Sequence, residues 1–307
     1  RLVVEEDPRR TDVHHVYVRA PQPEVVWSIG IRTGCSPWSL APPLDDQPAL
    51  TAADVTDVPA TSVADPFLIH RDGRWQMLFE VDDWLARKGS IGLATSDDGL
   101  RWRYERIVLA EPFHLSYPCV FEADGDIWMT PESTQAGAVR LYRARRFPDE
   151  WEHVADLLTG GCFADPTPLR HDGRWWLFAE TSGDRNDTLR LFGADRLTGP
   201  WREHPASPVV RDDAVHARPA GPVIAADGRL VRVAQNCLPA YGTEVRGMEI
   251  TRLTPTDYAE RPLARPPLAA PGDRRWNARG MHHVAVAMTA AGRWLAATDG
   301  WTMEGAS

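Results

Sequence analysis

Residues 63–81 read VADPFLIHRDGRWQMLFEV, and residues 163–181 read FADPTPLRHDGRWWLFAET. Both stretches contain Ala-Asp-Pro, a short apolar run, Asp-Gly-Arg-Trp and a second apolar run that ends near a glutamate. Asp-Gly between two apolar runs is typical of a β-hairpin, because a type I′ turn requires positive φ at both central residues. Two copies of this hairpin in one chain predict an internal repeat.

Three further glycines stand in the same place between two apolar runs. The five turn glycines, 48 to 64 residues apart, are Gly73, Gly125, Gly173, Gly228 and Gly292. Intervals of roughly 50 residues are typical of four-stranded propeller blades, and long helical periodicities are missing. The fifth turn leaves no room for outer strands before Ser307, so residues 25–40 are expected to supply one and close the ring.

The sequence therefore predicts an all-β fold, a five-bladed β-propeller whose last blade is closed by the N-terminal strand. We expect a single domain over residues 1–307, with the last blade shared between both chain ends. The blade cores are expected near 63–102, 115–151, 163–201, 216–258 and 281–301 plus 25–40.

Composition excludes several classes of function. The net charge of −9 argues against a nucleic-acid or anionic-membrane surface, and no apolar stretch is long enough to span a membrane. The four cysteines lack the spacing of a zinc site or a disulfide framework. No signal peptide is visible, so the location is expected to be cytoplasmic or stays unknown, and oligomeric state stays open.

Two rings of polar residues follow from the repeat. Eight residues before the first three turn glycines stand Asp65, Tyr117 and Asp165, each followed by proline, with Arg218 and the pair His282-His283 in the last two blades. Seven residues after the five glycines stand Glu80, Glu132, Glu180, Gln235 and Asp299. Because the first strand of a blade starts where the second ends, both rings are expected at one mouth of the channel.

Several motifs carry a family resemblance. They are WSIGI (27–31), ADPF (64–67), KGSIGLATSDDGLRW (88–102), HLSYP (114–118), TPES (130–133), ARPAG (217–221) and HH (282–283). They resemble the N-terminal propeller of plant glucosamine inositolphosphorylceramide transferases, and more distantly the furanosidase clan of arabinanases, xylosidases, invertases and levansucrases. Bacterial proteins also carry this domain, and a bacterial protein is expected here. In the plant proteins a separate domain transfers the sugar, so that activity is not carried over.

The resemblance to the furanosidase clan implies three catalytic carboxylates, and this chain keeps only part of the set. The clan uses an aspartate in blade one, an aspartate in blade two and a glutamate in blade three. Asp65 matches the first, the second position reads Ser116-Tyr117-Pro118, and the third is Asp165. Either the roles have moved to Asp165 and the glutamate ring, or glycosidase chemistry is absent.

These residues give two hypotheses. The first is a glycoside hydrolase-like enzyme acting on a sugar or glycoside by acid/base catalysis, with Asp65 and Asp165 opposed across the mouth as an inverting reaction needs. Glu132 and Glu180 are alternative acids. The second hypothesis is a non-catalytic propeller for sugar recognition or partner docking.

The remaining polar residues of the mouth are expected to bind substrate. The predicted binding residues are Glu80, His114, Tyr117, Arg218, Gln235, Tyr241, His282 and His283. Strand alternation predicts that at most one of the two adjacent histidines faces the channel. No cofactor is expected: His114, His282 or His283 with an aspartate could bind a metal ion, but no ligand spacing supports one.

Overall fold

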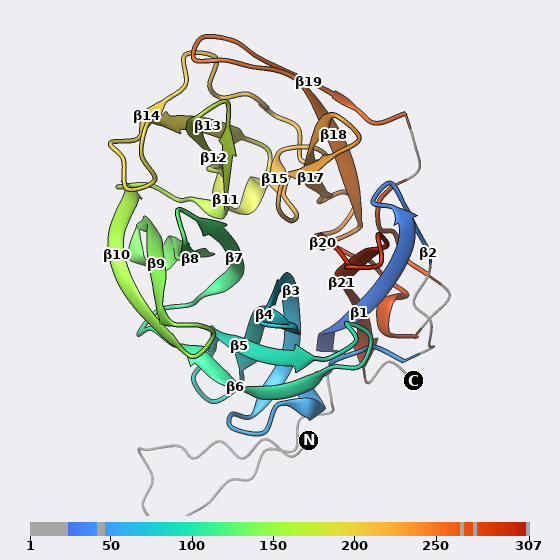
Figure 1. Cartoon of the computed structure of the whole chain (residues 1–307). Helices are drawn as coiled ribbons and strands as arrows, with labels where there is room; N and C mark the ends of the chain where they lie inside the picture. Colours follow the sequence, from blue (N-terminus) through green and yellow to red (C-terminus); the bar gives the residue numbers. More distant parts are fainter. Residues whose placement is uncertain (1–23, 42–46, 265–266, 273–274, 305–307) are drawn as a thin grey trace, which may run out of the picture.

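The computed structural model describes residues 24–41, 47–264, 267–272 and 275–304. Five antiparallel sheets lie in a ring around one axis, and the chain passes through them in order (Figure 1). This confirms the predicted five-bladed propeller. Helix in the described residues is limited to the 3-10 turns η1 (Ala52–Asp54), η2 (Thr134–Ala136), η3 (Gly183–Arg185) and η4 (Arg275–Asn277). No helix in these ranges has the length and apolar character needed to cross a membrane.

Each blade begins at the channel and runs outward (Figure 1). Blade 1 comprises β3 (Ala60–Arg71), β4 (Arg74–Asp83), β5 (Lys88–Ser96) and β6 (Arg103–Leu109). Blade 2 comprises β7 (Ser116–Ala123), β8 (Asp126–Glu132), β9 (Ala138–Arg146) and β10 (Glu150–Thr159). Blade 3 comprises β11 (Ala164–His171), β12 (Arg174–Glu180), β13 (Leu189–Ala194) and β14 (Arg202–Glu203).

The last two blades depart from this plan. Blade 4 comprises β15 (Arg218–Pro219), β16 (Ile224–Ala226), β17 (Arg229–Asn236), β18 (Glu244–Leu253) and β19 (Tyr258–Pro262), so its inner strand is split in two. Blade 5 comprises β20 (Val284–Met288), β21 (Trp294–Glu304), β1 (Glu24–Ser36) and β2 (Ser39–Ala41). The strand β1 pairs with β21 from Glu24↔Glu304 to Gly34↔Trp294, which confirms the predicted closure by both chain ends.

Four of the five expected type I′ turns are present. Asp72, Asp124, Asp172 and Asp227 each have φ between 49° and 54°, and each is followed by a glycine with positive φ. The fifth turn differs, because in it only Gly292 has positive φ. This turn is closed by a hydrogen bond from the Gly292 N–H to the Thr289 carbonyl. Alanine at position 291 does not favour the left-handed region as aspartate does.

The hydrophobic core lies between the blades. Five clusters of buried side chains fill the five interfaces: Val63 and Phe79 of blade 1, for example, pack with Ile29 and Leu295 of blade 5. Stability therefore depends on closing the ring, since an unclosed interface would expose one cluster.

Gly280 joins the closing blade to the loop that follows β17. A Cβ atom at this position would overlap the Gly242 carbonyl oxygen and the indole Nε1 of Trp301. That indole donates to the same carbonyl at 3.0 Å. We expect Gly280→Ala to cost about 1–3 kcal/mol of unfolding free energy through overpacking, measured by urea denaturation. Gly173→Asn is the control, because nothing lies within 4 Å of its Cβ position and asparagine tolerates positive φ; an equal loss in both variants would contradict the clash.

Candidate functional site

A cavity of about 350 Å³ opens at the mouth where the inner strands begin. Seven predicted site residues line it: Asp65, Glu80, His114, Glu132, Arg218, Tyr241 and His282. The other lining residues are Val25, Trp27, Ser62, Ala64, Asp82 and Ser116. Tyr117, Asp165, Glu180, Gln235 and His283 are not part of the lining.

The same backbone irregularity occurs in the inner strand of the first three blades, inside β3 and at the second residue of β7 and of β11. Asp65, Tyr117 and Asp165 have φ of 52°, 45° and 49°, the left-handed region that non-glycine residues rarely adopt. At each of them the pairing with the second strand shifts register, as in a β-bulge. Backbone strain of this kind persists only where surrounding contacts enforce it, and it is common at functional sites.

Carboxylates of the preceding blade hold these three residues in place. Asp299 Oδ2 accepts the N–H of Asp65 at 2.9 Å, Asp65 Oδ2 accepts that of Tyr117 at 3.1 Å, and Glu132 Oε2 accepts that of Asp165 at 3.1 Å. The polar ring thus links blade 5 to 1, 1 to 2 and 2 to 3. Part of its role is structural.

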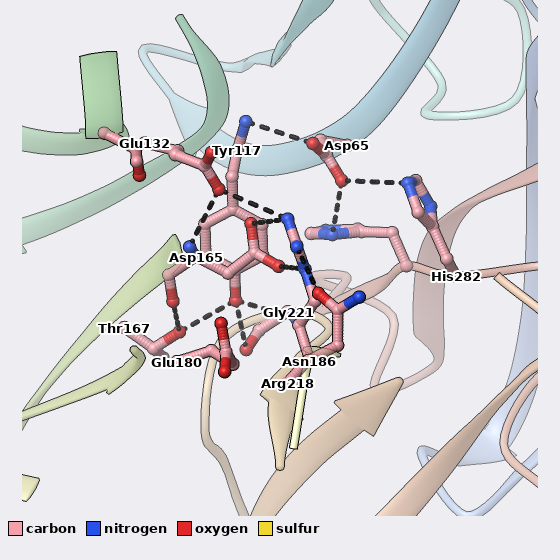
Figure 2. Close-up of polar contacts among 12 residues, drawn as sticks. Asp65, Tyr117, Glu132, Asp165, Thr167, Glu180, Asn186, Arg218, Gly221 and His282 are labelled. Atoms are coloured by element: carbon pink, nitrogen blue, oxygen red, sulfur yellow. Dashed lines mark hydrogen bonds and ion pairs between the residues drawn. The ribbon is translucent and has the colours of Figure 1, made fainter. Parts of the chain in front are cut away.

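Asp65 is contacted by two imidazoles, one of which, His282, is labelled in Figure 2. His283 Nδ1 lies 3.5 Å and His282 Nε2 3.8 Å from its Oδ1. Burial alone would raise the pKa of Asp65, but His282, His283 and Arg218 lower it to about 2. Burial likewise opposes the charge of His282, yet Asp299 and Asp65 raise its pKa to about 9. At neutral pH this is a carboxylate beside an imidazolium.

The expectation about the two adjacent histidines is wrong in one respect. His282 and His283 do not point to opposite sides, because both approach the same oxygen of Asp65. Residues 281–283 precede β20, so the alternation of an extended strand does not apply to them. Only His282 reaches the cavity, while His283 is fully buried against Phe67 and Tyr117.

Glu80 and His114 form a second pair at the pocket wall. His114 Nε2 lies 3.2 Å from Glu80 Oε1, and the Gly89 N–H donates to His114 Nδ1 at 2.8 Å. Burial disfavours the charged imidazolium of His114, but Glu80 favours it and raises the pKa of His114 to about 8. The hydrogen bond from the Gly89 N–H, however, requires that Nδ1 carry no proton. We therefore assign the neutral ring with its proton on Nε2. Burial raises the pKa of Glu80 above its ordinary value.

Arg218 binds protein groups with all of its nitrogens (Figure 2). Nε donates to Asp165 at 2.6 Å, Nη1 to Asn186 at 2.7 Å, and Nη2 to Glu132 at 3.3 Å. Burial opposes its charge, but Asp165 and Glu132 raise the pKa of Arg218 well above its usual value. Asp165 is consequently held in a buried ion pair outside the pocket lining, which argues against an Asp65/Asp165 pair opposed across the mouth.

Three more predicted site residues are placed away from the pocket. The buried Tyr117 hydroxyl bonds Thr167 and the backbone of Gly221 across the channel, so Tyr117 cannot be a sugar platform (Figure 2). Glu180 Oε1 accepts the N–H groups of Ser182 and Thr188 in its own blade. Gln235 is 1% exposed and pairs with Arg218 in the sheet.

An aromatic wall at the mouth was only partly predicted. Tyr241 is 42% exposed, and its ring meets that of Trp27 edge-on at 6.3 Å. Trp27 stacks on His282 at 4.0 Å with an interplanar angle of 24°. Trp27 was not predicted, because its role depends on strand closure rather than on the repeat. Asp82 could have been found, since it follows Glu80 by two residues and shares its side of β4.

Asp65, His282 and Asp299 have the right proximity for a metal site, with one ligand atom of each within 4.8 Å of the others. Their donor contacts do not fit a metal ion. Asp299 Oδ1 accepts two backbone N–H groups, and its Oδ2 accepts that of Asp65 and lies 2.7 Å from His282 Nδ1. A charged imidazole between two carboxylates accounts for the cluster without a cation.

The sequence of this chain matches one family model and several named proteins. The family model described as "Glucosamine inositolphosphorylceramide transferase 1, N-terminal" matches residues 20–301. The proteins named glucosamine inositolphosphorylceramide transferase 1 of Oryza sativa subsp. japonica and Arabidopsis thaliana are 34% and 31% identical, over 91% and 89% of this chain. The chain spans only 40% and 39% of their lengths.

These relatives overturn one expectation and leave another without support. Both are plant proteins, which contradicts the expectation of a bacterial protein. Both are named transferases, so hydrolysis gains no support from them.

Solved structures resemble the chain in fold alone. An exo-β-1,3-galactanase from Clostridium thermocellum has a TM-score of 0.58 at 12% identity and covers 69% of this chain and 51% of its own. A family 117 glycoside hydrolase from Zobellia galactanivorans has a TM-score of 0.54 at 14% identity and covers 79% and 85%.

Proposed function

This chain belongs to the family of glucosamine inositolphosphorylceramide transferase N-terminal domains, and from that premise we propose that its central pocket binds a sugar-containing substrate and acts on it by general acid–base catalysis. The curated members carry a sugar-transferase name, but their names describe proteins much longer than this chain. The proposed activity is therefore one of this pocket.

The observation that carries the proposal is a pair of carboxyl groups with opposite pKa shifts in one pocket. The pKa of Asp65 is lowered to about 2, while that of Glu80 is raised. Both line the cavity, and Glu80 lies across from Ala64, the neighbour of Asp65, in the β3–β4 pairing. Environments that push two pKa values apart assign one group as base and the other as acid.

Cleavage of a glycosidic bond then has a proton donor, Glu80, and a proton acceptor, Asp65. Glu80 gives its proton to the oxygen that leaves the anomeric carbon, and the carbon–oxygen bond breaks. Asp65 takes the proton from the attacking hydroxyl, of water or of a second sugar, as the new carbon–oxygen bond forms. Water gives cleavage and a sugar hydroxyl gives rearrangement or transfer. His114, donating from Nε2, steadies Glu80 after it loses its proton.

The size and walls of the pocket suit a sugar. A volume of about 350 Å³ lies at the small end of the range of ligand pockets. Trp27 and Tyr241 offer aromatic surface, and the carboxylates of the lining can accept hydrogen bonds from hydroxyls. We expect a substrate of one or two sugar units.

The rate is expected to fall as pH rises through the raised pKa of Glu80, because the acid must hold its proton. It should persist far into the acid range, because Asp65 stays ionised above about pH 2. The measurement is initial rate against pH for whichever glycoside of a broad panel is turned over. Glu80→Gln should lose the alkaline limb, and an aryl glycoside with an acidic leaving group should recover most of the rate because it needs no acid. An unchanged profile in the variant would contradict the assignment.

Non-catalytic sugar recognition is the second candidate, and two observations favour it. Asp65 Oδ2 is engaged by the Tyr117 N–H, and the position of the clan's second aspartate is occupied by that buried tyrosine. Under this alternative, glycosides bind without turnover and Glu80→Gln changes affinity alone.

A further inference from the structure

His283 is a fully buried histidine that does not line the cavity. Neither of its ring nitrogens has a hydrogen-bond partner among the described residues. A buried polar group without a partner costs free energy, and a leucine would fill such a position without that cost. The imidazole is therefore expected to serve a group that it faces.

Two aromatic rings hold the imidazole of His283 in one place. The ring of Phe67 lies 4.7 Å from it and that of Tyr117 5.4 Å, at interplanar angles of 64° and 74°. Tyr117 is itself fixed, because its hydroxyl bonds Thr167 and the backbone of Gly221. The imidazole consequently has little freedom to turn.

The group that this imidazole faces is the carboxylate of Asp65. His283 Nδ1 lies 3.5 Å from Asp65 Oδ1. A carboxylate can only accept hydrogen bonds, so a favourable contact places the ring proton on Nδ1. The distance is longer than that of a full hydrogen bond. Hydrogen bonds between catalytic groups are often long until substrate binds, and they shorten in the complex.

Asp299 fixes the backbone from which the imidazole projects. Its Oδ1 accepts the N–H groups of His282 and His283 at 3.1 and 3.0 Å, and its Oδ2 accepts that of Asp65 at 2.9 Å. One carboxylate thus sets the positions of both the imidazole and the aspartate. The Tyr117 N–H donates to Asp65 Oδ2 at 3.1 Å, while the two imidazoles contact Oδ1.

His282 and His283 differ in whether a ligand can reach them. His282 lines the cavity and lies between Asp65 and Asp299, so a substitution there alters the pocket itself. His283 is fully buried behind the lining. Its effect on a reaction in the pocket can pass only through Asp65 and the surrounding packing.

Other charged and titratable groups surround Asp65 and act on it together with the two imidazoles. Burial raises the pKa of Asp65, and His282, His283 and Arg218 lower it to about 2. Besides the imidazoles, six groups from all five blades face it: Glu80, Tyr117, Asp165, Arg218, Tyr241 and Asp299. A substitution at position 283 leaves all six in place.

We propose that His283 is a positioning residue for Asp65: its Nδ1–H holds Oδ1 and keeps the carboxylate in one orientation toward the pocket. The inference rests on the proposed function in one respect, since it takes Asp65 to be the group that accepts the proton. Asparagine should replace His283 in this role, because its side-chain amide nitrogen can stand where Nδ1 stands now.

The test compares His283→Asn with His283→Leu through the titration of the Asp65 carboxyl group, followed by ¹³C NMR of the whole chain and assigned with Asp65→Asn. Leucine removes the donor, so the midpoint should rise by about one pH unit or more, because a charged hydrogen bond is lost. Asparagine keeps a donor, so the midpoint should stay near that of the unmodified protein. Thermal stability should follow the opposite order, because buried asparagine has an unpaired carbonyl that leucine lacks.

Turnover of a cleavable glycoside gives a second measurement. His283→Leu should lower kcat about tenfold and leave KM within about twofold, because His283 contacts no substrate. The acid limb of the pH profile should move to higher pH in the leucine variant alone, because Asp65 then binds its proton more tightly. His204→Leu is the control: it removes a buried histidine that packs on Trp176 outside the cavity lining, so it should lower stability without moving the titration.

A measurement on the unmodified protein covers the case in which a variant fails to fold. ¹⁵N NMR of the histidine rings should show the His283 proton on Nδ1, and a bare Nδ1 overturns the inference. An unmoved Asp65 titration in His283→Leu, or an equal shift in His283→Asn, overturns it as well. If no glycoside is turned over, the proposed function fails, while the carboxyl titration and the ring proton still decide whether His283 holds Asp65.

Discussion

Replacing Asp65 by asparagine is expected to lower the turnover of a cleavable glycoside by about 10²–10⁴-fold. The substitution keeps the shape of the side chain and removes its charge and basicity. The amide oxygen of the new side chain can still accept the Tyr117 N–H that Asp65 accepts now, so the bulge that opens blade 2 should persist. The measurement is kcat for both proteins, with circular dichroism and thermal unfolding to confirm the fold.

Asp165→Asn is the matched comparison for this result. It removes a charge from the Arg218 ion pair rather than from the pocket lining, so it should affect stability more than the pH dependence of the rate. A loss at Asp165 equal to that at Asp65, with both variants fully folded, would favour the opposed pair of the furanosidase clan. Undiminished turnover in Asp65→Asn would exclude Asp65 as the base.

The second large effect is expected at a buried ion pair in blade 4. The side chains of Arg232 and Glu260 are 1% and 8% exposed, and Arg232 Nε donates to Glu260 at 2.9 Å. Glu260→Ala would leave a buried guanidinium without its carboxylate. We expect it to lower the unfolding free energy by about 3–5 kcal/mol, measured by urea denaturation.

Two further variants interpret that loss. Arg232→Met combined with Glu260→Leu should recover most of the stability, because an apolar pair has no unpaired charge. Glu150→Ala breaks the exposed pair with Arg146 and should cost under about 1 kcal/mol. If Glu260→Ala and Glu150→Ala cost the same, the Arg232–Glu260 pair does not carry the stability assigned to it.

The repeat in the sequence predicted most of the fold because turn chemistry is local. Asp-Gly requires two positive φ values, and four of the five turns adopt them. The closing strand was also predictable, since an incomplete fifth blade needs outer strands. The split of the inner strand of blade 4 into β15 and β16 was not, because the path of Gly221 is set by contact with Val284 of blade 5.

The sequence predicted which residues stand at the mouth of the channel, but not which way their side chains point. Position in the repeat indicated which residues stand at the mouth, and seven of the twelve proposed site residues line one cavity. Which of them turn toward ligand depends on the left-handed bulge and on tertiary partners. Tyr117 turns into the channel and Asp165 toward Arg218 for reasons that involve other blades.

The carboxylates that fasten one blade to the next have a consequence for comparing family members by sequence. Asp65 would be retained under selection for a closed ring even in a member without catalysis, because its Oδ2 accepts the N–H of Tyr117, the second residue of β7. An aspartate at this position is therefore a poor marker of activity. Glu80 contacts His114, which lies two residues before β7 and accepts the Gly89 N–H, so this pair touches the linker into blade 2 rather than the N–H of a strand residue. Joint retention of Glu80 and His114 should therefore mark family members that act on sugars, and their joint loss should mark members that keep the fold without the activity.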